Sequence, residues 1–268
     1  MGAITTAGTG HYEGFDRDEY TINGVKTVVY SAGQGQPVVY FHGGGTFHGI
    51  DFSRDWLDRF KIICPFHPGF GESADAPHMD SINDYILHYL DLFDELGLKQ
   101  FNLIGISLGG WLAAEFAIAH GHRLRKLVLL APGGLNVPEY PPIDFSTVPP
   151  EEVLTYLVHD FDILKPYLPK NDQDAEAFGA DRMREGQSLG RMAPAGPRSP
   201  KLEHWLHRIT TPTLLLWGNN DRVLPAGQAE KWMKLLPNAR LELLDSIGHL
   251  ILDESRPARK IVADFLSN

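Results

Sequence analysis

The stretch from Gln100 to Ala119 reads QFNLIGISLGGWLAAEFAIA and decides the fold. Its first part, Gln100–Ile104, is a short apolar run of the kind found in strands buried on both faces of a sheet. Its second part, Leu108–Ala119, has the length and spacing of a helix. Between the two parts lies Gly105-Ile106-Ser107-Leu108-Gly109, whose glycines allow a sharp bend. The stretch therefore predicts a buried strand that turns directly into a helix.

The same alternation of strands and helices extends along most of the chain. Apolar, β-branched runs alternate with helix-period segments, a pattern that predicts an α/β fold with a mostly parallel sheet and helices on both faces. The pair Asn23-Gly24 within Thr21–Ser31 predicts an antiparallel hairpin at the start. Expected strands are Pro37–Phe41, Lys61–Cys64, Gln100–Ile104, Lys126–Leu130, Thr213–Trp217 and Arg240–Leu244. Expected helices are Ile82–Leu96 (ended by Gly97), Leu108–Ala119 (ended near Gly121), Gln228–Leu236 and Pro257–Leu266.

Composition and charge exclude several classes of protein. The 268 residues carry 24 basic and 34 acidic side chains, and the formal net charge of -10 repels nucleic acid and anionic lipid. No run approaches 18 consecutive apolar residues, and Met1–Gly10 lacks the basic and apolar regions of a secretory leader. The single cysteine, Cys64, cannot form an internal disulfide and is expected to be a strand residue. These features predict a cytoplasmic protein without a nucleic-acid or membrane partner. They are compatible with a homo-oligomer.

One region interrupts the alternation. Pro132–Pro200 holds more than half of the 19 prolines and contains no run that resembles a buried strand. Because long disordered loops are uncommon in compact domains, the region is predicted to be an inserted cap. The expected division is a core domain at 1–131 and 206–268, interrupted by a cap at 132–205. The expected cap helices are Pro150–His159 and Asp172–Leu189, with Arg182, Arg184 and Arg191 on or just after the second.

Ser107 has the sequence context of a catalytic nucleophile. In a G-x-S-x-G motif between a strand and a helix, a strained turn exposes the serine hydroxyl. A hydroxyl is a poor nucleophile at neutral pH, so it needs a histidine base and a carboxylate that orients the imidazole. His249 and Asp221 each follow a predicted strand, at the edge of the sheet where sites form. The alternative carboxylates are Asp245, expected to close its strand, and Asp253, expected in the helical region that follows.

Acyl transfer also needs backbone N–H groups that face the developing oxyanion. The turn supplies one from Leu108, and the glycine-rich loop His42-Gly43-Gly44-Gly45 supplies the other, with Gly44 as the expected donor. Gly43 is expected to contact the substrate, because a residue without a side chain lets a carbonyl approach the backbone. His42 is expected to brace the loop, and a plain flexible turn of glycines is the alternative. Histidine pairs elsewhere lack a third ligand, so no metal or other cofactor is expected.

Together these residues resemble the α/β-hydrolase superfamily. The resemblance extends from Tyr20 to Leu266 and includes Pro68-Gly69-Phe70-Gly71-Glu72-Ser73 and Gly248-His249. It implies an eight-stranded core, a catalytic site at the carboxyl ends of the strands, and a cap after the strand Lys126–Leu130. The superfamily has many activities, so the resemblance implies little about the substrate.

Comparison with other members of the superfamily reduces the number of possible reactions. Ser107 argues against dehalogenases and epoxide hydrolases, which place an aspartate at this position. Carbon–carbon bond hydrolases of ring-cleavage products are similar in the serine, the length and the glycine-rich loop. They carry asparagine, methionine and tryptophan where this chain has Ile106, Leu108 and Leu250. Arg184 lies at about the distance past the serine that is typical of that family's cap arginine.

The sequence thus predicts a cofactor-free serine hydrolase with a small-molecule substrate, a carboxylesterase that cleaves small to medium carboxylic esters through an acyl-enzyme on Ser107. The alternatives are a carbon–carbon bond hydrolase of meta-cleavage-type dienoates and a non-catalytic ligand-binding member of the same fold. The expected site consists of the catalytic residues Ser107, Asp221 and His249, the oxyanion donors Gly44 and Leu108, and the substrate contacts Gly43 and Arg184.

Overall fold

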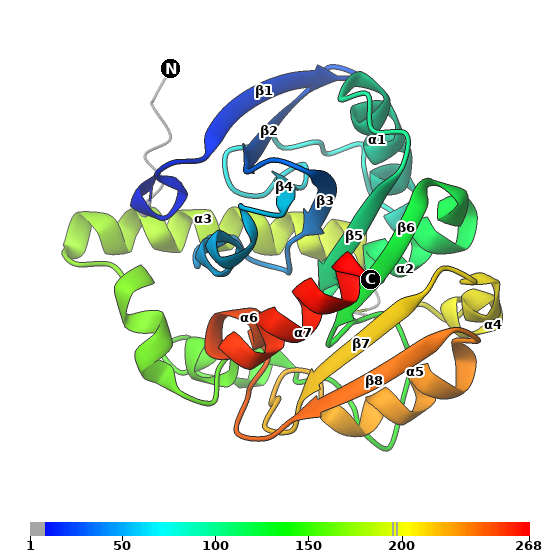
Figure 1. Ribbon diagram of the computed structural model, residues 1–268. Coiled ribbons are helices and arrows are strands. Elements are labelled where there is room, and N and C mark those ends of the chain that lie inside the picture. Colours follow the sequence, from blue (N-terminus) through cyan, green and yellow to red (C-terminus); the bar gives the residue numbers. More distant parts are fainter. Residues whose placement is uncertain (1–8, 195, 197) are drawn as a thin grey trace.

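The described part of the chain folds around one sheet of eight strands (Figure 1). The computed structural model describes residues 9–194, 196 and 198–268, and the expectation for Met1–Gly10 falls mainly on residues 1–8, outside this part. The strand order is β1-β2-β4-β3-β5-β6-β7-β8. The strands are β1 Asp16–Ile22, β2 Val25–Ala32, β3 Gln36–Phe41, β4 Phe60–Pro65, β5 Phe101–Ile106, β6 Leu124–Leu130, β7 Thr213–Gly218 and β8 Ala239–Leu244.

The first two strands form the predicted hairpin. β1 pairs with β2, and β2 with β4, in antiparallel fashion, whereas all pairs from β4 to β8 are parallel. Asn23 and Gly24 have φ values of 49° and 81°, as a two-residue hairpin turn requires. β1 begins at Asp16, earlier than expected. The reason is that this edge strand is mostly exposed, so its residues show no apolar alternation.

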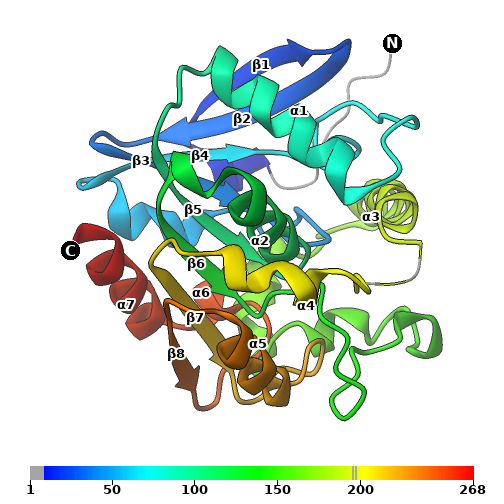
Figure 2. The same cartoon turned by 90° about the vertical axis from the view of Figure 1, so that its right-hand side faces the viewer.

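Helices cover both faces of the sheet, as the sequence predicts for the α/β class. The helices are α1 Ile82–Glu95, α2 Leu108–His120, α3 Asp172–Met192, α4 Leu202–Trp205, α5 Ala229–Leu235, α6 Ile251–Glu254 and α7 Arg256–Ser267. Figure 2 shows α7 on the opposite side of the sheet from α1, α2 and α5. The helix α2 packs on β5 and β6, and α7 packs on β7. The central strands are therefore covered on both faces, which explains their continuous apolar sequence.

Local signals set the ends of the helices. The helix α1 begins with a capping box, in which the Ser81 hydroxyl accepts the Asp84 N–H and the Asp84 carboxylate accepts the Ser81 N–H. Gly97, just after it, has a φ of 66°, as the sequence suggested. Gly121 behaves differently: its φ is -56°, and the chain continues into the 3₁₀ turn Gly121–Arg123. The α2 boundary is close to the prediction, but it does not depend on a left-handed glycine.

Residues 132–205, called the cap segment below, contain helical turns but no strand among their described residues. The helix α3 starts at Asp172 as predicted and extends past Leu189 to Met192. It lies against the loops that follow β3 and β4, because Glu185 accepts hydrogen bonds from the Thr46 hydroxyl and the Gly71 N–H. The division of the chain into a core and a separate cap remains a prediction.

The helix predicted at Pro150–His159 is wrong. This stretch contains only the 3₁₀ turn Val153–Tyr156. The carbonyl oxygen of Leu157 accepts the backbone N–H groups of His249 and Leu250, at 3.0 and 2.9 Å. Because these bonds come from a distant part of the chain, no local pattern in the sequence reveals them.

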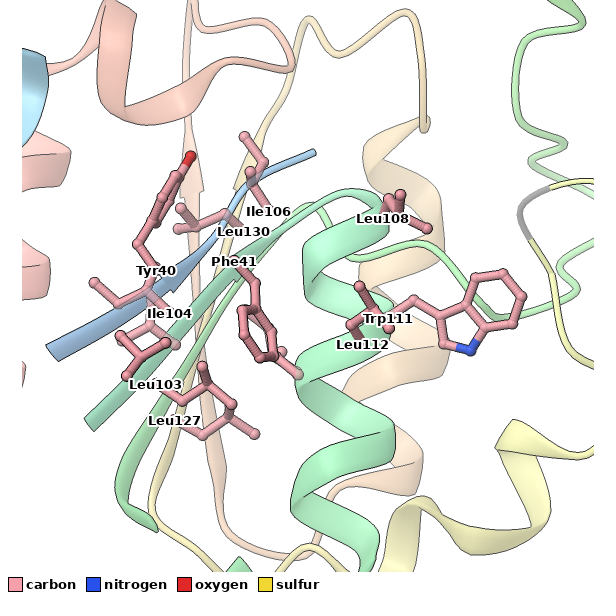
Figure 3. Packing of buried hydrophobic residues seen from close by; sticks show 14 of the residues in the cluster. Tyr40, Phe41, Leu103, Ile104, Ile106, Leu108, Trp111, Leu112, Leu127 and Leu130 are labelled. Atoms are coloured by element: carbon pink, nitrogen blue, oxygen red, sulfur yellow. The ribbon is translucent and has the colours of Figure 1, made fainter. Parts of the chain in front are cut away.

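The centre of the sheet is fully buried and supports the site. All residues of β5 and β7 are buried. Figure 3 shows side chains of β3, β5 and β6 packed together with those of α2, among them Phe41, Leu103 and Leu127. Cys64 is a buried residue of β4, as expected. Such close packing holds the carboxyl ends of these strands, and the loops that follow them, in fixed positions.

Candidate active site

Ser107 occupies the predicted strained turn between β5 and α2. Its φ and ψ are 54° and -116°, which is unfavourable for a residue with a side chain. Backbone hydrogen bonds compensate for the strain. The Ser107 N–H donates to the Leu130 carbonyl at 3.0 Å, and the Ser107 carbonyl accepts the N–H groups of Gly133 and Trp111 at 2.9 and 3.1 Å. The serine is therefore held at the end of β5 in a conformation that does not relax.

The two glycines of the motif are required by close contacts. A Cβ at Gly105 would lie 2.2 Å from the Gly109 carbonyl oxygen, and a Cβ at Gly109 would lie 2.1 Å from the Phe41 carbonyl oxygen. Both distances are far below van der Waals contact with backbone atoms that cannot move freely. The spacing of the G-x-S-x-G motif thus reflects how closely α2 approaches β3 and β5.

The glycine-rich loop after β3 lies directly against the serine. A Cβ at Gly43 would be 3.5 Å from the Ser107 Cβ. Leu108 is the first residue of α2, so its N–H has no acceptor within that helix. The structure therefore brings the loop that carries Gly44 next to Ser107, which Leu108 directly follows in the chain.

His249 and Asp221 form a buried pair at the carboxyl ends of β8 and β7. The His249 Nδ1 lies 2.7 Å from the Asp221 Oδ2. The other carboxylate oxygen, Oδ1, accepts the backbone N–H groups of Val223 and Leu224 at 2.8 and 2.9 Å. Because a carboxylate only accepts hydrogen bonds, the pair places the imidazole proton on Nδ1 and leaves Nε2 as an acceptor.

The two alternative carboxylates have other partners. Asp245 is exposed and accepts a hydrogen bond from the Asn219 amide. Asp253 is buried, and its Oδ1 lies 3.3 Å from the Nδ1 of His48. Of the three candidates, Asp221 is thus the one that contacts His249.

The cap segment holds the loop that carries His249. Besides the two N–H groups bound by Leu157, the Gly248 N–H donates to Glu254 Oε2 at 2.7 Å. The other Glu254 oxygen accepts the backbone N–H of His159 in the cap segment, also at 2.7 Å. Neither Leu157 nor Glu254 was expected from the sequence, because both act through backbone groups of residues far along the chain.

His42 braces the glycine-rich loop together with a second histidine that sequence analysis missed. The His42 Nδ1 donates to the Gly43 carbonyl at 2.8 Å, and the His42 Nε2 accepts the backbone N–H of His67 at 3.0 Å. Burial lowers the pKa of His42 well below its ordinary value and the pKa of His67 to about 3, so both rings are neutral. The one signal in the sequence is that His67 directly precedes the Pro68-Gly69 pair of the family motif.

Arg184, the expected substrate contact, binds backbone carbonyls of the loop that follows β4. Its Nη2 donates to the Gly71 carbonyl at 2.5 Å and to Asp181 at 3.0 Å, and its Nη1 donates to the Gly69 carbonyl at 3.4 Å. These contacts fasten α3 to the loop after β4.

Arg182 is the α3 arginine that reaches the glycine-rich loop. A Cβ at Gly45 would be 2.6 Å from its Nη1. The guanidinium lies 5.3 Å from the ring centres of both Phe47 and Phe178. Its Nη1 also lies 2.6 Å from Oε2 of the buried Glu185. The positive charge beside the glycine-rich loop is therefore already paired.

Two general features bear on binding partners. None of the helices within the described ranges combines the length and apolar character needed to cross a membrane. Across the same ranges, no three His, Cys, Asp or Glu side chains lie close enough together to hold a metal ion.

A strained serine at a strand-to-helix turn, a glycine-rich loop against it and a buried His–Asp pair at the same sheet edge define a class of enzyme, the hydrolases of α/β architecture. The model of the alpha/beta hydrolase fold family matches residues 36–255. The chain belongs to this family.

Similar proteins include hydrolases of two kinds. A 2-hydroxy-6-oxo-6-phenylhexa-2,4-dienoate hydrolase from Burkholderia cepacia is 28% identical over 88% of this chain and 90% of its own. A 2-hydroxymuconate semialdehyde hydrolase from Pseudomonas putida is 27% identical over 91% and 92% of the two chains. The crystal structure of naproxen esterase from Bacillus subtilis superposes with a TM-score of 0.80 over 99% of both chains, at 20% identity. The last likeness concerns the fold alone.

Proposed function

We propose that this protein is a serine hydrolase that cleaves small to medium carboxylic esters through an acyl-enzyme on Ser107. The observation that carries the proposal is the buried hydrogen bond between Asp221 and His249, at the same sheet edge as the strained serine. This bond leaves Nε2 of His249 free to accept a proton, which is what a serine nucleophile requires.

The proposed reaction has two halves. His249 Nε2 takes the proton from the Ser107 hydroxyl while the serine oxygen attacks the ester carbonyl. The N–H groups of Leu108 and Gly44 stabilise the negative oxygen that forms. The bond to the alcohol then breaks, and His249 gives its proton to the departing oxygen. A water molecule releases the acid from Ser107 by the same steps, with His249 again as base. Gly43 lies where the substrate carbonyl approaches the loop.

The choice of a neutral ester over a dienoate rests on the arginines of α3. A dienoate carries a carboxylate, which needs an available cation. Arg184 is bound to the Gly69 and Gly71 carbonyls and to Asp181, and Arg182 is paired with Glu185. A neutral ester needs neither charge. We therefore also infer that residues 132–205 act as a cap that positions the substrate through shape more than through charge.

The second candidate is a carbon–carbon bond hydrolase of meta-cleavage-type dienoates. The relatives from Burkholderia cepacia and Pseudomonas putida favour it, since their names describe hydrolases of such compounds. In that case Arg182, beside Gly45, is the candidate cation for the carboxylate, and it would have to release Glu185 to bind one.

Three measurements test the proposal. A serine-directed fluorophosphonate should label the wild-type protein and fail to label Ser107→Ala, and this substitution should lower ester turnover by about 10³-fold or more. p-Nitrophenyl esters of graded chain length, assayed beside 2-hydroxy-6-oxo-6-phenylhexa-2,4-dienoate, then separate the two chemistries. Faster turnover of the dienoate than of every ester would refute the ester assignment. A wild-type protein that takes no label and turns over neither substrate would support the ligand-binding alternative.

A further inference from the structure

The glycine-rich loop is held by imidazole groups at two successive peptide bonds. The His67 Nε2 lies 2.9 Å from the His42 carbonyl oxygen, which belongs to the peptide joining His42 to Gly43. The His42 Nδ1 lies 2.8 Å from the Gly43 carbonyl oxygen, which belongs to the peptide joining Gly43 to Gly44. Each of the two peptide planes is thus bound through its carbonyl by one histidine ring.

The proton positions in this network follow from its partners. The backbone N–H of His67 donates to His42 Nε2, so the single proton of the neutral His42 ring is on Nδ1. The His42 carbonyl can only accept, so the neutral His67 ring carries its proton on Nε2. The hydroxyl of the buried Tyr89 contacts His67 Nδ1 and therefore donates to it. Every polar atom of the two rings then has a partner.

Because each peptide is planar, a carbonyl held on one side of the loop fixes the direction of the N–H group on the other side. In a trans peptide the N–H points away from the carbonyl oxygen, so fixing the two carbonyls also fixes the N–H groups of Gly43 and Gly44. Glycine has wide conformational freedom and no side chain to restrict it, so the loop does not fix these directions by itself. A Cβ placed on Gly43 would lie 3.5 Å from the Ser107 Cβ, so this segment lies beside the nucleophile.

We propose that His67, held by Tyr89, is a positioning residue that orients the oxyanion-binding N–H groups of the glycine-rich loop. The inference rests on the proposed function, since it assigns His67 a part in stabilising the tetrahedral intermediate. His67 acts through His42 and the loop and does not touch the substrate. Its low pKa, about 3 because of burial, keeps the ring neutral throughout the pH range of an ester assay.

Matched variants separate the hydrogen bonds of His67 from its packing. His67→Phe keeps an aromatic ring beside His42 but removes the donor, whereas His67→Gln retains an amide N–H that can bind the His42 carbonyl. Tyr89→Phe removes only the hydroxyl that fixes the His67 ring. The control is His88→Phe: this histidine is also buried, but its Nε2 binds the Thr27 hydroxyl, 2.9 Å away.

The expected result is a loss in kcat rather than in KM. His67→Phe should lower kcat for a p-nitrophenyl ester by about 10- to 100-fold with KM within about threefold of wild type. The reason is that the loop N–H groups, once their directions are no longer fixed, stabilise the oxyanion of the transition state less well, whereas the bound ester has no such charge. His67→Gln should recover most of this loss, Tyr89→Phe should lose about threefold, and His88→Phe should stay within about twofold. A trifluoromethyl ketone, which forms a tetrahedral oxyanion on the serine, should bind the His67→Phe variant correspondingly more weakly, while the analogous alcohol binds equally well.

Two results from the kinetic and binding assays would overturn the inference. One is an active His67→Phe variant with unchanged kcat; the other is a variant in which ketone and alcohol affinities fall together, as a general disturbance of the core predicts. Nitrogen NMR of the imidazoles in the wild-type protein adds a readout that needs no activity. The proposal requires the proton on Nε2 of His67 and on Nδ1 of His42, and the opposite tautomer of either ring rejects it. Failure of the proposed function is distinct, since it leaves the wild type unlabelled by fluorophosphonate and inactive on esters.

Discussion

Asp221→Asn is the substitution whose effect follows most directly from the geometry. Oδ1 of Asp221 accepts two buried backbone N–H groups, from Val223 and Leu224, and Oδ2 faces the His249 Nδ1. An asparagine has one oxygen and one NH₂ group. If the oxygen stays with the two N–H donors, the NH₂ group faces His249 and forces the imidazole proton onto Nε2, where it blocks acceptance of the serine proton.

The alternative orientation of the asparagine is costly. Turning the oxygen towards His249 leaves two buried N–H donors unsatisfied, at about 1–3 kcal/mol each. The productive arrangement is therefore disfavoured by about 2–6 kcal/mol, and the imidazolium that forms during the reaction also loses its counter-charge. Since about 1.4 kcal/mol corresponds to a tenfold change, we expect kcat/KM to fall by about 10²- to 10⁴-fold.

The assay is ester hydrolysis by Asp221→Asn beside two matched controls. Asp245→Asn and Asp253→Asn make the same chemical change at the two competing carboxylates, one exposed and bound to Asn219, the other bound to His48. Thermal unfolding of all three variants checks that the fold is retained. A loss below about tenfold for Asp221→Asn, or a larger loss for either control, would refute the assignment of Asp221.

Further outcomes are expected for activity and for stability. The value of kcat/KM should rise with pH, because only a neutral His249 accepts the serine proton, whereas burial lowers the pKa of His42 and brings that of His67 to about 3, so both of these rings are already neutral. A chelator should leave the rate unchanged. Arg184→Ala should change kcat/KM for a neutral ester by less than about threefold, because its guanidinium binds the loop after β4; a loss of about 10²-fold on a dienoate in Arg182→Ala would favour the carbon–carbon chemistry instead. Lowering the pH from about 6.5 to about 5 should reduce the free energy of unfolding, measured with urea, by about 2 kcal/mol through His67. The reason is that His67 takes up a proton in the unfolded chain but not in the folded protein, where the ring is buried. His67→Gln should remove this contribution to the pH dependence of the free energy of unfolding.

The predictable parts of the fold are those set by residues that are close together in the sequence. The strand-turn-helix around Ser107 follows from apolar runs and glycines that are adjacent in sequence, and the strained φ of 54° has the same origin. The exposed strand β1 was predicted too short, because an edge strand needs no apolar alternation. The false helix at Pro150–His159 has the opposite cause: the Leu157 carbonyl binds N–H groups some ninety residues away along the chain, and no local pattern reports this.

The residues of the candidate site also fall into those with a local sequence signal and those without one. Ser107, Asp221 and His249 could be predicted as candidates because each lies at or shortly after the end of a strand of a parallel sheet, and such strands bring their carboxyl ends to one edge. His67, Tyr89 and Glu254 were missed. They act on the site through hydrogen bonds between segments that are distant in sequence, and their residue types alone do not distinguish them from ordinary buried polar side chains.

The substrate preference depends on which arginine of α3 lies beside the glycine-rich loop. Residues two positions apart on a helix point about 200° apart, so Arg182 and Arg184 face different surroundings, and the sequence gives no indication of which one faces the glycine-rich loop. In the structure Arg184 faces the Gly69–Gly71 loop, and Arg182 faces Gly45. Glu185, one position from Arg184, neutralises Arg182. A paired charge beside the glycine-rich loop favours a neutral substrate, because binding a carboxylate there would first separate Arg182 from the buried Glu185 and leave that carboxylate without its counter-charge.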